Sequence, residues 1–586
     1  MKAESIAAAA ALQVPDGEPL VDLDWLEDGW RQPDALAAAL QQWLAGPSTG
    51  PFKSVPGARY DLYNDWVGRH LHKDRVALRS HDHRKARDDR WSSLSYDELD
   101  RRCGLRAASW ARQGVQPGAV LVVMRMLGAE ALVSLLAGLR LGACISHLEP
   151  LGPAYVAPRL EALGAQHICS AAFHDPWLGE SAELRLEPEG IETPMASSHT
   201  YAADEPCALL FSPLRRPPAL PVPLPAAQAH LGALRDGTVT LALRPGDAVA
   251  APGLHRQQHQ PGLLLSTLCA GATFVHLSHD DVRRDPSLLD AYPLRTLGLD
   301  ASTCEALLDA RGARSHPWEH VVHNPEEPTD WEAWRELIET QGLSKTAMST
   351  VVFEAASGGA VLTSPRRPGT DHLAALMNVI PAPGRPWTLL DFTRTGQSCP
   401  GDAGVYAPAE PPPPLDGETE PETTPAEPAP IEPIYIALGR RRGGEYLYGG
   451  TLDPRRSGRV FPTDEVLAAL EDCPFLDGAS MVVVPSGGAT LAQRFVLLGF
   501  CGHQSPERFR ALGAARRDEL ERMLATRLGP DFLPDRIELF PLLPRKSDGA
   551  VDHAWCQAQY RSGSLYAKAR TPLFLRTTEL RQLTTR

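Results

Sequence analysis

Residues 212–220, which read SPLRRPPAL, form a loop whose residue types and spacing could support chemistry. It follows the apolar run at 207–211 and precedes an Ala-rich, helix-compatible segment at 226–234. Many proteins bind a phosphate between a strand and a helix, through the backbone N–H groups of residues that are free to adopt positive φ. Arg215 and Arg216 could attract a phosphate in this loop as mobile surface charges.

The same loop lacks the residues that a phosphate-binding backbone needs. Pro213, Pro217 and Pro218 have no N–H group and hold φ near −65°, and the loop contains no glycine. We therefore interpret residues 212–220 as a proline-stiffened surface loop, with phosphate binding by the two arginines as the alternative.

Histidine spacing offers a second candidate, a metal site. His255 and His259 are four residues apart, a spacing that places two imidazoles on one face of a helix. No acidic residue lies between them, and the preceding Pro252 and Gly253 favour a loop. An ordinary polar loop is the better interpretation, and the sequence predicts no metal site.

The elements that must position any site follow a βαβ order. Ser95 and Glu98 match a capping box, which predicts a helix that runs to about Gly114. Because strands joined by crossover helices are parallel, this order predicts a parallel sheet. The predicted units are a buried strand at 119–126, a helix at 129–141 and a strand at 142–147.

Residues 96–150, from YDELDRRCGLRAASWARQG to GLRLGACISHLEP, closely resemble the adenylate-forming superfamily, the acyl-CoA synthetases or AMP-dependent synthetases and ligases. The pattern at 324–365, 444–484 and 531–557 is similar to acetyl-CoA synthetase-like members. This resemblance implies an α/β fold. We expect a large N-terminal domain of two stacked βαβ-type subdomains plus a small β-barrel, followed by a small α+β C-terminal domain.

The same resemblance sets the expected domain boundaries: 1–450 for the large domain, 451–560 for a lid-like C-terminal domain, and 561–586 for a basic tail. Residues 408–433 interrupt the large domain with seven acidic residues, no basic residue and many prolines. A segment of this composition cannot bury enough apolar surface to order itself, so we predict a disordered, extended linker.

The resemblance also places the family's chemical groups on this chain, where several are replaced. The family's phosphate loop closes on a lysine, and Leu220 stands in its place. The family's magnesium-binding glutamate matches Ala356 without a gap, or Glu354 with one. The ribose-binding aspartate has no counterpart in residues 434–440.

Two further positions belong to the expected C-terminal domain. Asp453 lies near the family's hinge acid. The family's adenylate-forming lysine is here Ala550, and Lys546, four residues earlier, is a candidate replacement. We assign no catalytic residue beyond this candidate.

Composition limits the partners and the compartment. The net charge of −14 and the pI of about 5.8 argue against nucleic acid or an anionic membrane as the main partner. The ten cysteines are scattered without a CxxC pair, which favours a reducing cytoplasm. No apolar run is long enough for a transmembrane helix.

Three functional hypotheses follow. The first is a pseudoenzyme in a biosynthetic pathway: a catalytically degenerate acyl-CoA synthetase-like protein that binds a partner protein or a small acyl or carboxylate ligand. The alternative is an active acyl-CoA or acyl-carrier-protein ligase with relocated groups, which would use ATP, Mg²⁺ and CoA. The second alternative is a different acyl-transfer or thioester chemistry in the same cleft, although no GxSxG motif is present.

Overall fold

The structure is a computed structural model of the 586-residue chain. It describes residues 20–21, 23, 25–45, 58–83, 85, 90–150, 152–171, 175–179, 181, 185–186, 193–211, 221–254, 262–310, 318–325, 331–354, 358–364, 372–384, 387–390, 403–408, 436–440, 445–451, 455–456, 459–460, 463–485, 493–501, 506–528, 533–546 and 549–568. No helix among these residues is long and apolar enough to cross a membrane.

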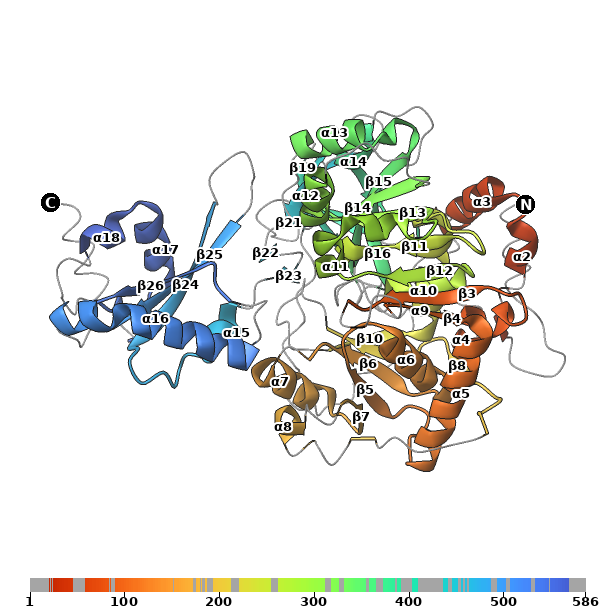
Figure 1. Cartoon of the computed structure of the whole chain (residues 1–586), viewed down its shortest axis with the longest axis horizontal. Helices are drawn as coiled ribbons and strands as arrows, with labels where there is room; N and C mark the ends of the chain where they lie inside the picture. The colour runs from red at the N-terminus through yellow and green to blue at the C-terminus, as the bar shows by residue number, and fades with distance from the viewer. Residues whose placement is uncertain are drawn as a thin grey trace, which may run out of the picture. The chain divides into compact units, whose positions relative to one another are not determined.

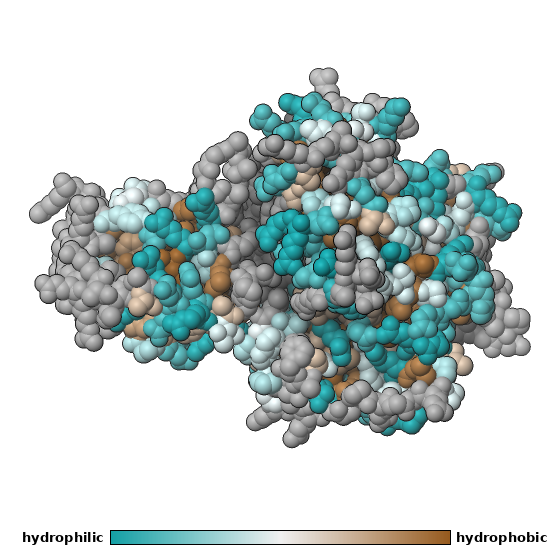
Figure 2. All heavy atoms as spheres, viewed as in Figure 1, coloured by the Kyte–Doolittle hydropathy of each residue, from teal (hydrophilic) through white to brown (hydrophobic). Residues whose placement is uncertain are grey.

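Contacts divide the chain into two compact units. The large unit contains residues 1–150, 159–175 and 180–453, and the small unit contains residues 151–158, 176–179 and 454–586. Figure 1 shows the large unit in red to cyan and most of the small unit in blue. On the face drawn in Figure 2, hydrophilic residues predominate on both units, with hydrophobic residues scattered among them.

The first sheet of the large unit confirms the predicted βαβ order. Its strand order is β10-β9-β6-β5-β7, and β5 is parallel to both β6 and β7. Helices α5 and α6 pack together beside this sheet (Figure 1). Its elements are α5 (Tyr96–Arg112), β5 (Val120–Met124), α6 (Ala129–Leu141), β6 (Cys144–Leu148), α7 (Pro153–Leu163), β7 (His167–Cys169), α8 (Asp175–Leu178), β9 (Pro206–Leu210) and β10 (Val222–Pro225).

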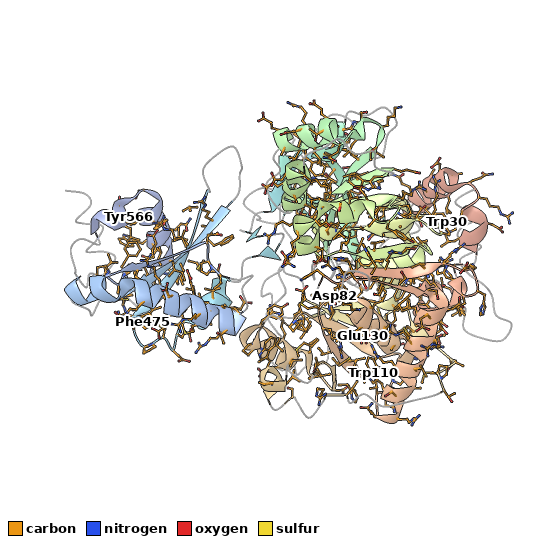
Figure 3. The ribbon with its side chains drawn as sticks, in the orientation of Figure 1. Trp30, Asp82, Trp110, Glu130, Phe475 and Tyr566 are labelled. Atoms are coloured by element: carbon orange, nitrogen blue, oxygen red, sulfur yellow. The ribbon has the colours of Figure 1, made fainter. Side chains whose placement is uncertain are left out.

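Helix α5 begins where predicted, but only half of the capping box forms. The Ser95 side chain accepts a hydrogen bond from the backbone N–H of Glu98 at 3.1 Å. The Glu98 carboxylate instead accepts two hydrogen bonds from Arg101, one turn further along the helix. At the other side of α5, Arg106 donates to Glu130 at the start of α6 (labelled in Figure 3), which joins the two helices.

The second sheet has thirteen strands, in the order β18-β19-β20-β21-β17-β16-β15-β14-β13-β11-β12-β3-β4. The run β3-β12-β11-β13-β14-β15 is parallel throughout, whereas β4 is antiparallel to β3 and β16 is antiparallel to β15. The elements are β3 (Val76–His81), β4 (Trp91–Ser95), α9 (Ala226–Arg235), η6 (Asp236–Thr240), β11 (Ala248–Ala250), η7 (Pro252–Leu254), α10 (Gly262–Cys269), β12 (Thr273–His276), α11 (His279–Arg284), η8 (Pro286–Asp290), β13 (Thr296–Leu299), α12 (Ala301–Asp309), β14 (His320–His323), α13 (Trp331–Thr340), η9 (Leu343–Lys345) and β15 (Ala347–Glu354).

Where a small β-barrel was predicted, antiparallel strands continue this sheet. Among the described residues their pairings leave β18 at an edge and do not close a ring. The described elements here are β16 (Gly359–Thr363), α14 (His372–Met377), β17 (Asn378–Pro381), β18 (Trp387–Leu390), β19 (Ala403–Pro408), β20 (Ile436–Arg440) and β21 (Tyr446–Thr451). Residues 409–433 of the predicted linker lie outside the described residues.

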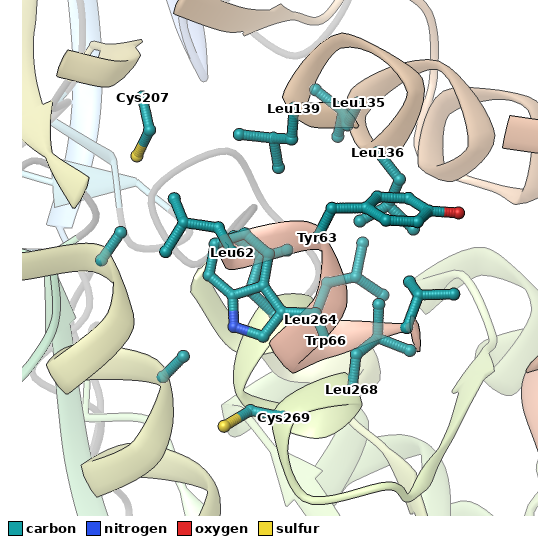
Figure 4. Close-up of a cluster of buried hydrophobic side chains, with 14 of the residues drawn as sticks. Leu62, Tyr63, Trp66, Leu135, Leu136, Leu139, Cys207, Leu264, Leu268 and Cys269 are labelled. Carbon is teal, nitrogen blue, oxygen red and sulfur yellow. The ribbon is translucent and has the colours of Figure 1, made fainter. Parts of the chain in front are cut away.

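The N-terminal segment packs into the hydrophobic core of the large unit. Figure 4 shows Trp66 of this segment near Leu264 and Leu268 of α10, and Tyr63 beside Leu136 of α6. Arg69 anchors the segment, because its guanidinium donates to the carbonyl oxygens of Leu23, Asp65 and Cys269. The elements are β1 (Leu20–Val21), α2 (Trp25–Gly29), α3 (Pro33–Ala45), β2 (Arg59–Tyr60), α4 (Leu62–Trp66), η2 (Gly68–His70) and β8 (Tyr201–Ala202).

The small unit is an α+β assembly around a three-stranded sheet in the order β24-β25-β26. Residues 561–568 of the predicted basic tail belong to this assembly: Tyr566 donates to Glu538 of β26 and packs on Phe540. The elements are β22 (Arg455–Arg456), β23 (Arg459–Val460), α15 (Thr463–Ala468), β24 (Gly478–Pro485), β25 (Gln493–Phe500), α16 (Pro506–Leu528), β26 (Arg536–Phe540), α17 (His553–Arg561) and α18 (Ser564–Lys568).

Candidate functional site

The candidate site is the part of the large unit that adjoins the predicted phosphate loop. Residues 212–220, including Arg215 and Arg216, lie outside the described residues, and so do His255 and His259. The flanking residues correct the predicted order, because the loop joins two antiparallel strands, β9 and β10, and α9 begins only after β10. Pro223 and Pro225 are tolerated in β10 because it is the edge strand of its sheet.

Helix α9 is held against the N-terminal segment by a buried hydrogen bond between a histidine and an aspartate. His230 Nε2 lies 2.9 Å from Asp65 Oδ2, and both side chains are at most 5% exposed. The edge of the His230 ring also packs on Tyr60, whose pKa burial raises to about 12. These contacts fix the orientation of α9 on the side away from the Gly-Gly turn at 358–359.

A π-helical turn, η6, follows α9 and carries the main polar feature of the site. Asp236 Oδ1 accepts hydrogen bonds from Arg235 Nε at 2.7 Å and from Thr240 Oγ1 at 3.3 Å. Its Oδ2 accepts from Arg235 Nη2 at 2.9 Å and from the backbone N–H of Ala360 at 2.8 Å. Both charged side chains are 1% exposed. The carboxylate is thus neutralised by a bidentate arginine and saturated with donors.

This ion pair borders a small cavity between α9, α10 and the turn that joins β15 to β16. The cavity has a volume of about 20 Å³, which is enough for roughly one water molecule. The backbones approach closely here, since a Cβ at Gly232 would overlap the carbonyl oxygen of Gly358. The lining residues are Leu210, Leu224, Ala229, Gly232, Ala233, Asp236, Gly262, Leu265, Ser266, Gly358 and Gly359.

Of the two predicted positions for a magnesium-binding glutamate, only one is described. Glu354 ends β15, is fully buried, and pairs through its backbone with Gly359 of the cavity wall. Ala356 and the predicted hinge residue Asp453 lie outside the described residues. The described residues contain no group of three His, Cys, Asp or Glu side chains that could bind a metal ion.

The remaining predicted site residues form a tight hairpin in the small unit. The backbone N–H of Lys546 donates to the carbonyl of Ala550 at 2.8 Å, and that of Gly549 donates to Lys546 at 3.0 Å. Arg545 and Val551 form an antiparallel bridge next to them. Lys546 and Ala550 are therefore directly opposite across the hairpin, and both are exposed. Opposite residues of an antiparallel pair project to the same face.

The two described cysteines beside the candidate site, Cys269 and Cys207, are poor candidates for thioester chemistry. All nine described cysteines are buried. Burial raises the pKa of Cys269, on the cavity helix α10, to about 12, and it raises the pKa of Cys207, on β9, further still. A thiol reacts as its thiolate, so a raised pKa makes these residues poor nucleophiles.

Comparisons with known proteins identify the fold. No family model and no curated protein matches the chain. A solved structure, the anthranilate CoA ligase AuaEII in complex with anthranoyl-AMP, matches with a TM-score of 0.54 and 16% identity, over 87% of this chain and 98% of that one. The chain has the fold of the adenylate-forming enzymes. The implied fold is thereby confirmed, and the low identity limits the inference to the fold.

Arg235 and Asp236, the best-defined polar pair of the site, were not predicted from the sequence. The helix-compatible segment was expected to end at Leu234, and the residues after it were given no role. An aspartate directly after an arginine at the end of a predicted helix gives only a weak indication of a functional site. The partner that reveals its position is the backbone of Ala360, far away in the sequence, and only the tertiary structure brings the two together.

Proposed function

We propose that this protein has the adenylate-forming fold but has lost the groups that catalyse adenylation. It uses the fold to bind a partner protein or a small acyl compound and does not adenylate a carboxylate. The cavity beside Asp236 is the observation that carries this proposal. Leu210 and Leu224, which flank the predicted phosphate loop in sequence, line it together with Gly358 and Gly359, and it has room for about one water molecule.

The chemistry of adenylation supports the same conclusion. Transfer to the α-phosphorus depends almost entirely on positioning and on cations that stabilise the developing charge. The loop sequence has no glycine and three prolines, and Ala550 replaces the lysine that the resemblance implies. Removing one preorganised donor typically lowers a rate by about 10²–10³. Several such losses together would reduce the rate of adenylation to a low level, although their effects do not add simply.

One observation favours the alternative, an active ligase with a relocated lysine. Lys546 lies opposite Ala550 and projects to the same face of the hairpin. A lysine has a long, flexible side chain, so an ammonium group at 546 could reach a position close to one carried at 550. Under this alternative ATP and Mg²⁺ would bind, and CoA or a carrier protein would accept the acyl group.

Carboxylate-dependent exchange of pyrophosphate into ATP separates the two functions. We expect the wild-type protein to show no exchange above background with a panel of carboxylic acids. Exchange that disappears in Lys546→Ala and persists in Lys345→Ala, an exposed lysine of the large unit, would establish the ligase and its relocated lysine.

A binding measurement covers the case in which the panel lacks the correct acid. A ligand that binds only the native state must raise the melting temperature. We expect Mg-ATP at millimolar concentration to leave the melting temperature unchanged. A concentration-dependent rise would contradict the loss of the nucleotide site.

We also propose that the protein resides in the cytoplasm. The nine described cysteines are free thiols, which supports a reducing compartment.

A further inference from the structure

Arg79 of β3 lies between two aromatic rings that come from different parts of the large unit. Its guanidinium carbon is 5.0 Å from the ring centroid of Trp91, on β4, and 4.8 Å from that of Tyr292, which follows η8. We call these three residues the arginine clamp. Asp82, labelled in Figure 3, directly follows β3, and β4 is the last strand on this side of the thirteen-stranded sheet. Two π faces hold a cation in a defined orientation.

The guanidinium in the clamp has no hydrogen-bond acceptor and no ion-pair partner among the residues that the structure describes. Its Nε is buried without a partner, whereas Nη1 and Nη2 are not buried, and the residue as a whole is partly exposed. A charged group that has lost part of its hydration destabilises a protein unless it is paired. The two rings compensate for some of that loss, and the outer edge of the guanidinium remains available to an anion.

The acidic side chains near the clamp interact with other groups. Asp281 Oδ1 lies 3.2 Å from His81 Nδ1 and 3.0 Å from His83 Nδ1, and its Oδ2 belongs to the capping box of α11. Asp82 and Asp290 also have interactions of their own, and neither forms an ion pair with the clamp. The described part of the chain therefore supplies the guanidinium with no carboxylate.

Ser93 places a hydroxyl beside the clamp. It pairs with Arg79 across the β3–β4 ladder, and opposite residues of an antiparallel pair project to the same face. Trp91, two residues before Ser93 on β4, is on this face as well. Because Ser93 is exposed, its hydroxyl can donate to an anion that is bound at the outer edge of the guanidinium.

The charges around the clamp favour a monoanion over a phosphate dianion. Residues 82–90, which join β3 to β4, contain four arginine or lysine residues and three aspartates. Helix α11, HDDVRR, carries two acidic residues and two arginines. With these segments nearly balanced, an anion meets mainly the charge of the one guanidinium. A guanidinium matches the planar carboxylate group with two parallel hydrogen bonds.

We propose that the arginine clamp binds a carboxylate. The two carboxylate oxygens accept hydrogen bonds from Nη1 and Nη2 of Arg79, and Ser93 donates to one of them. The same chemistry is present in a free short-chain acid and in a glutamate side chain of a partner protein. This site is independent of the proposed loss of adenylation, because none of its residues lines the cavity beside Asp236.

The test is calorimetric titration of the full chain at low ionic strength, where exposed charges are weakly screened. We expect saturable binding of sodium propionate and about tenfold or more weaker binding of propionamide, its neutral isostere. Absence of propionate binding would overturn the proposal, and so would propionamide or inorganic phosphate that binds as tightly as propionate. Nα-acetyl-glutamate methylamide carries the same propionate group on a peptide unit. Tighter binding of this probe indicates a partner protein, and equal or weaker binding indicates a free acid.

Substitutions locate the site. We expect Arg79→Gln to weaken propionate binding by about tenfold or more. Arg79→Lys keeps the charge and a cation between the rings but lacks the planar fork, so it should weaken binding by about fivefold. Arg283→Gln removes a cation of α11 whose side chain is 66% exposed and should change the affinity by less than about twofold. Equal effects of Arg79→Gln and Arg283→Gln, or wild-type affinity in Arg79→Lys, would contradict the proposed contact.

Discussion

Arg235 and Asp236 are a buried pair of charged side chains that links two elements beside the cavity of the candidate site. Buried charges destabilise a protein unless they are paired and hydrogen-bonded. Here the two groups neutralise each other, and Thr240 and the Ala360 backbone satisfy the remaining acceptor positions. The arrangement links η6 to β16 and leaves little space for a substrate beside it.

Breaking this pair is expected to be costly. Asp236→Ala leaves the Arg235 guanidinium buried without its counter-ion, so we expect the free energy of unfolding to fall by about 3–5 kcal/mol. Urea denaturation measures this change. The matched control is Asp28→Ala, which removes an exposed ion pair whose side chains are 82% and 83% exposed and should cost less than about 1 kcal/mol. Similar losses in both variants would show that the burial of the pair is unimportant.

At the scale of elements, α9 can approach the Gly-Gly turn closely only because it carries a glycine in its middle. In an open helix, Gly→Ala is stabilising by roughly 1 kcal/mol because alanine has the better helix propensity. At Gly232 the added Cβ would overlap the backbone of Gly358, whereas at Gly262, in α10, nothing lies within 4 Å of an added Cβ. We therefore expect a change from glycine to alanine to have opposite effects on stability at these two positions.

We expect Gly232→Ala to destabilise the protein by about 1–3 kcal/mol in spite of the propensity gain, since the overlap is with backbone and the helix must shift. Gly262→Ala should be neutral or slightly stabilising. Thermal unfolding followed by circular dichroism measures both. A stabilised Gly232→Ala variant would mean that α9 and the turn are further apart than the structure shows.

At the scale of the whole molecule, histidines whose pKa values are lowered by their surroundings make the large unit sensitive to acid. Burial, the largest cause in each case, lowers the pKa of His70 to about 2, of His276 to about 4 and of His323 to about 3. The cations Arg69, Lys73 and Arg75 lower the pKa of His70 further. These residues stay neutral in the folded protein at pH values where they are protonated in the unfolded chain.

The sign of the pH dependence follows from this difference. Below pH 6.5, the ordinary histidine pKa, the unfolded state binds protons that the folded state does not, so stability falls as the pH falls. At pH 5.5 each histidine should remove about 1 kcal/mol relative to pH 7.5. Urea midpoints measured from pH 7.5 to 5.5 test this expectation. The slope should decrease in His276→Gln and stay unchanged in His72→Gln, where the side chain is 90% exposed.

The sequence by itself determined the helices and strands whose type and bounds depend on residues close to them in the chain. The predicted helix at 129–141 matches α6 in both bounds, because an apolar run between Gly128 and Gly142 marks its ends. Ser95 caps α5 as its position before an amphipathic segment implied. The parallel pairing of β5 and β6 followed from their separation by a crossover helix.

Only the tertiary structure decided the features that depend on residues distant in sequence. Residues 222–225 contain two prolines, which central strands do not tolerate, yet they form β10 because the edge of the sheet needs no hydrogen bond from its outer side. Asp236 acquires its role from the backbone N–H of Ala360, which is far away in the sequence. Periodicity and capping act within a few residues, whereas a cavity or a buried ion pair depends on which surfaces pack together. That packing depends on the whole chain.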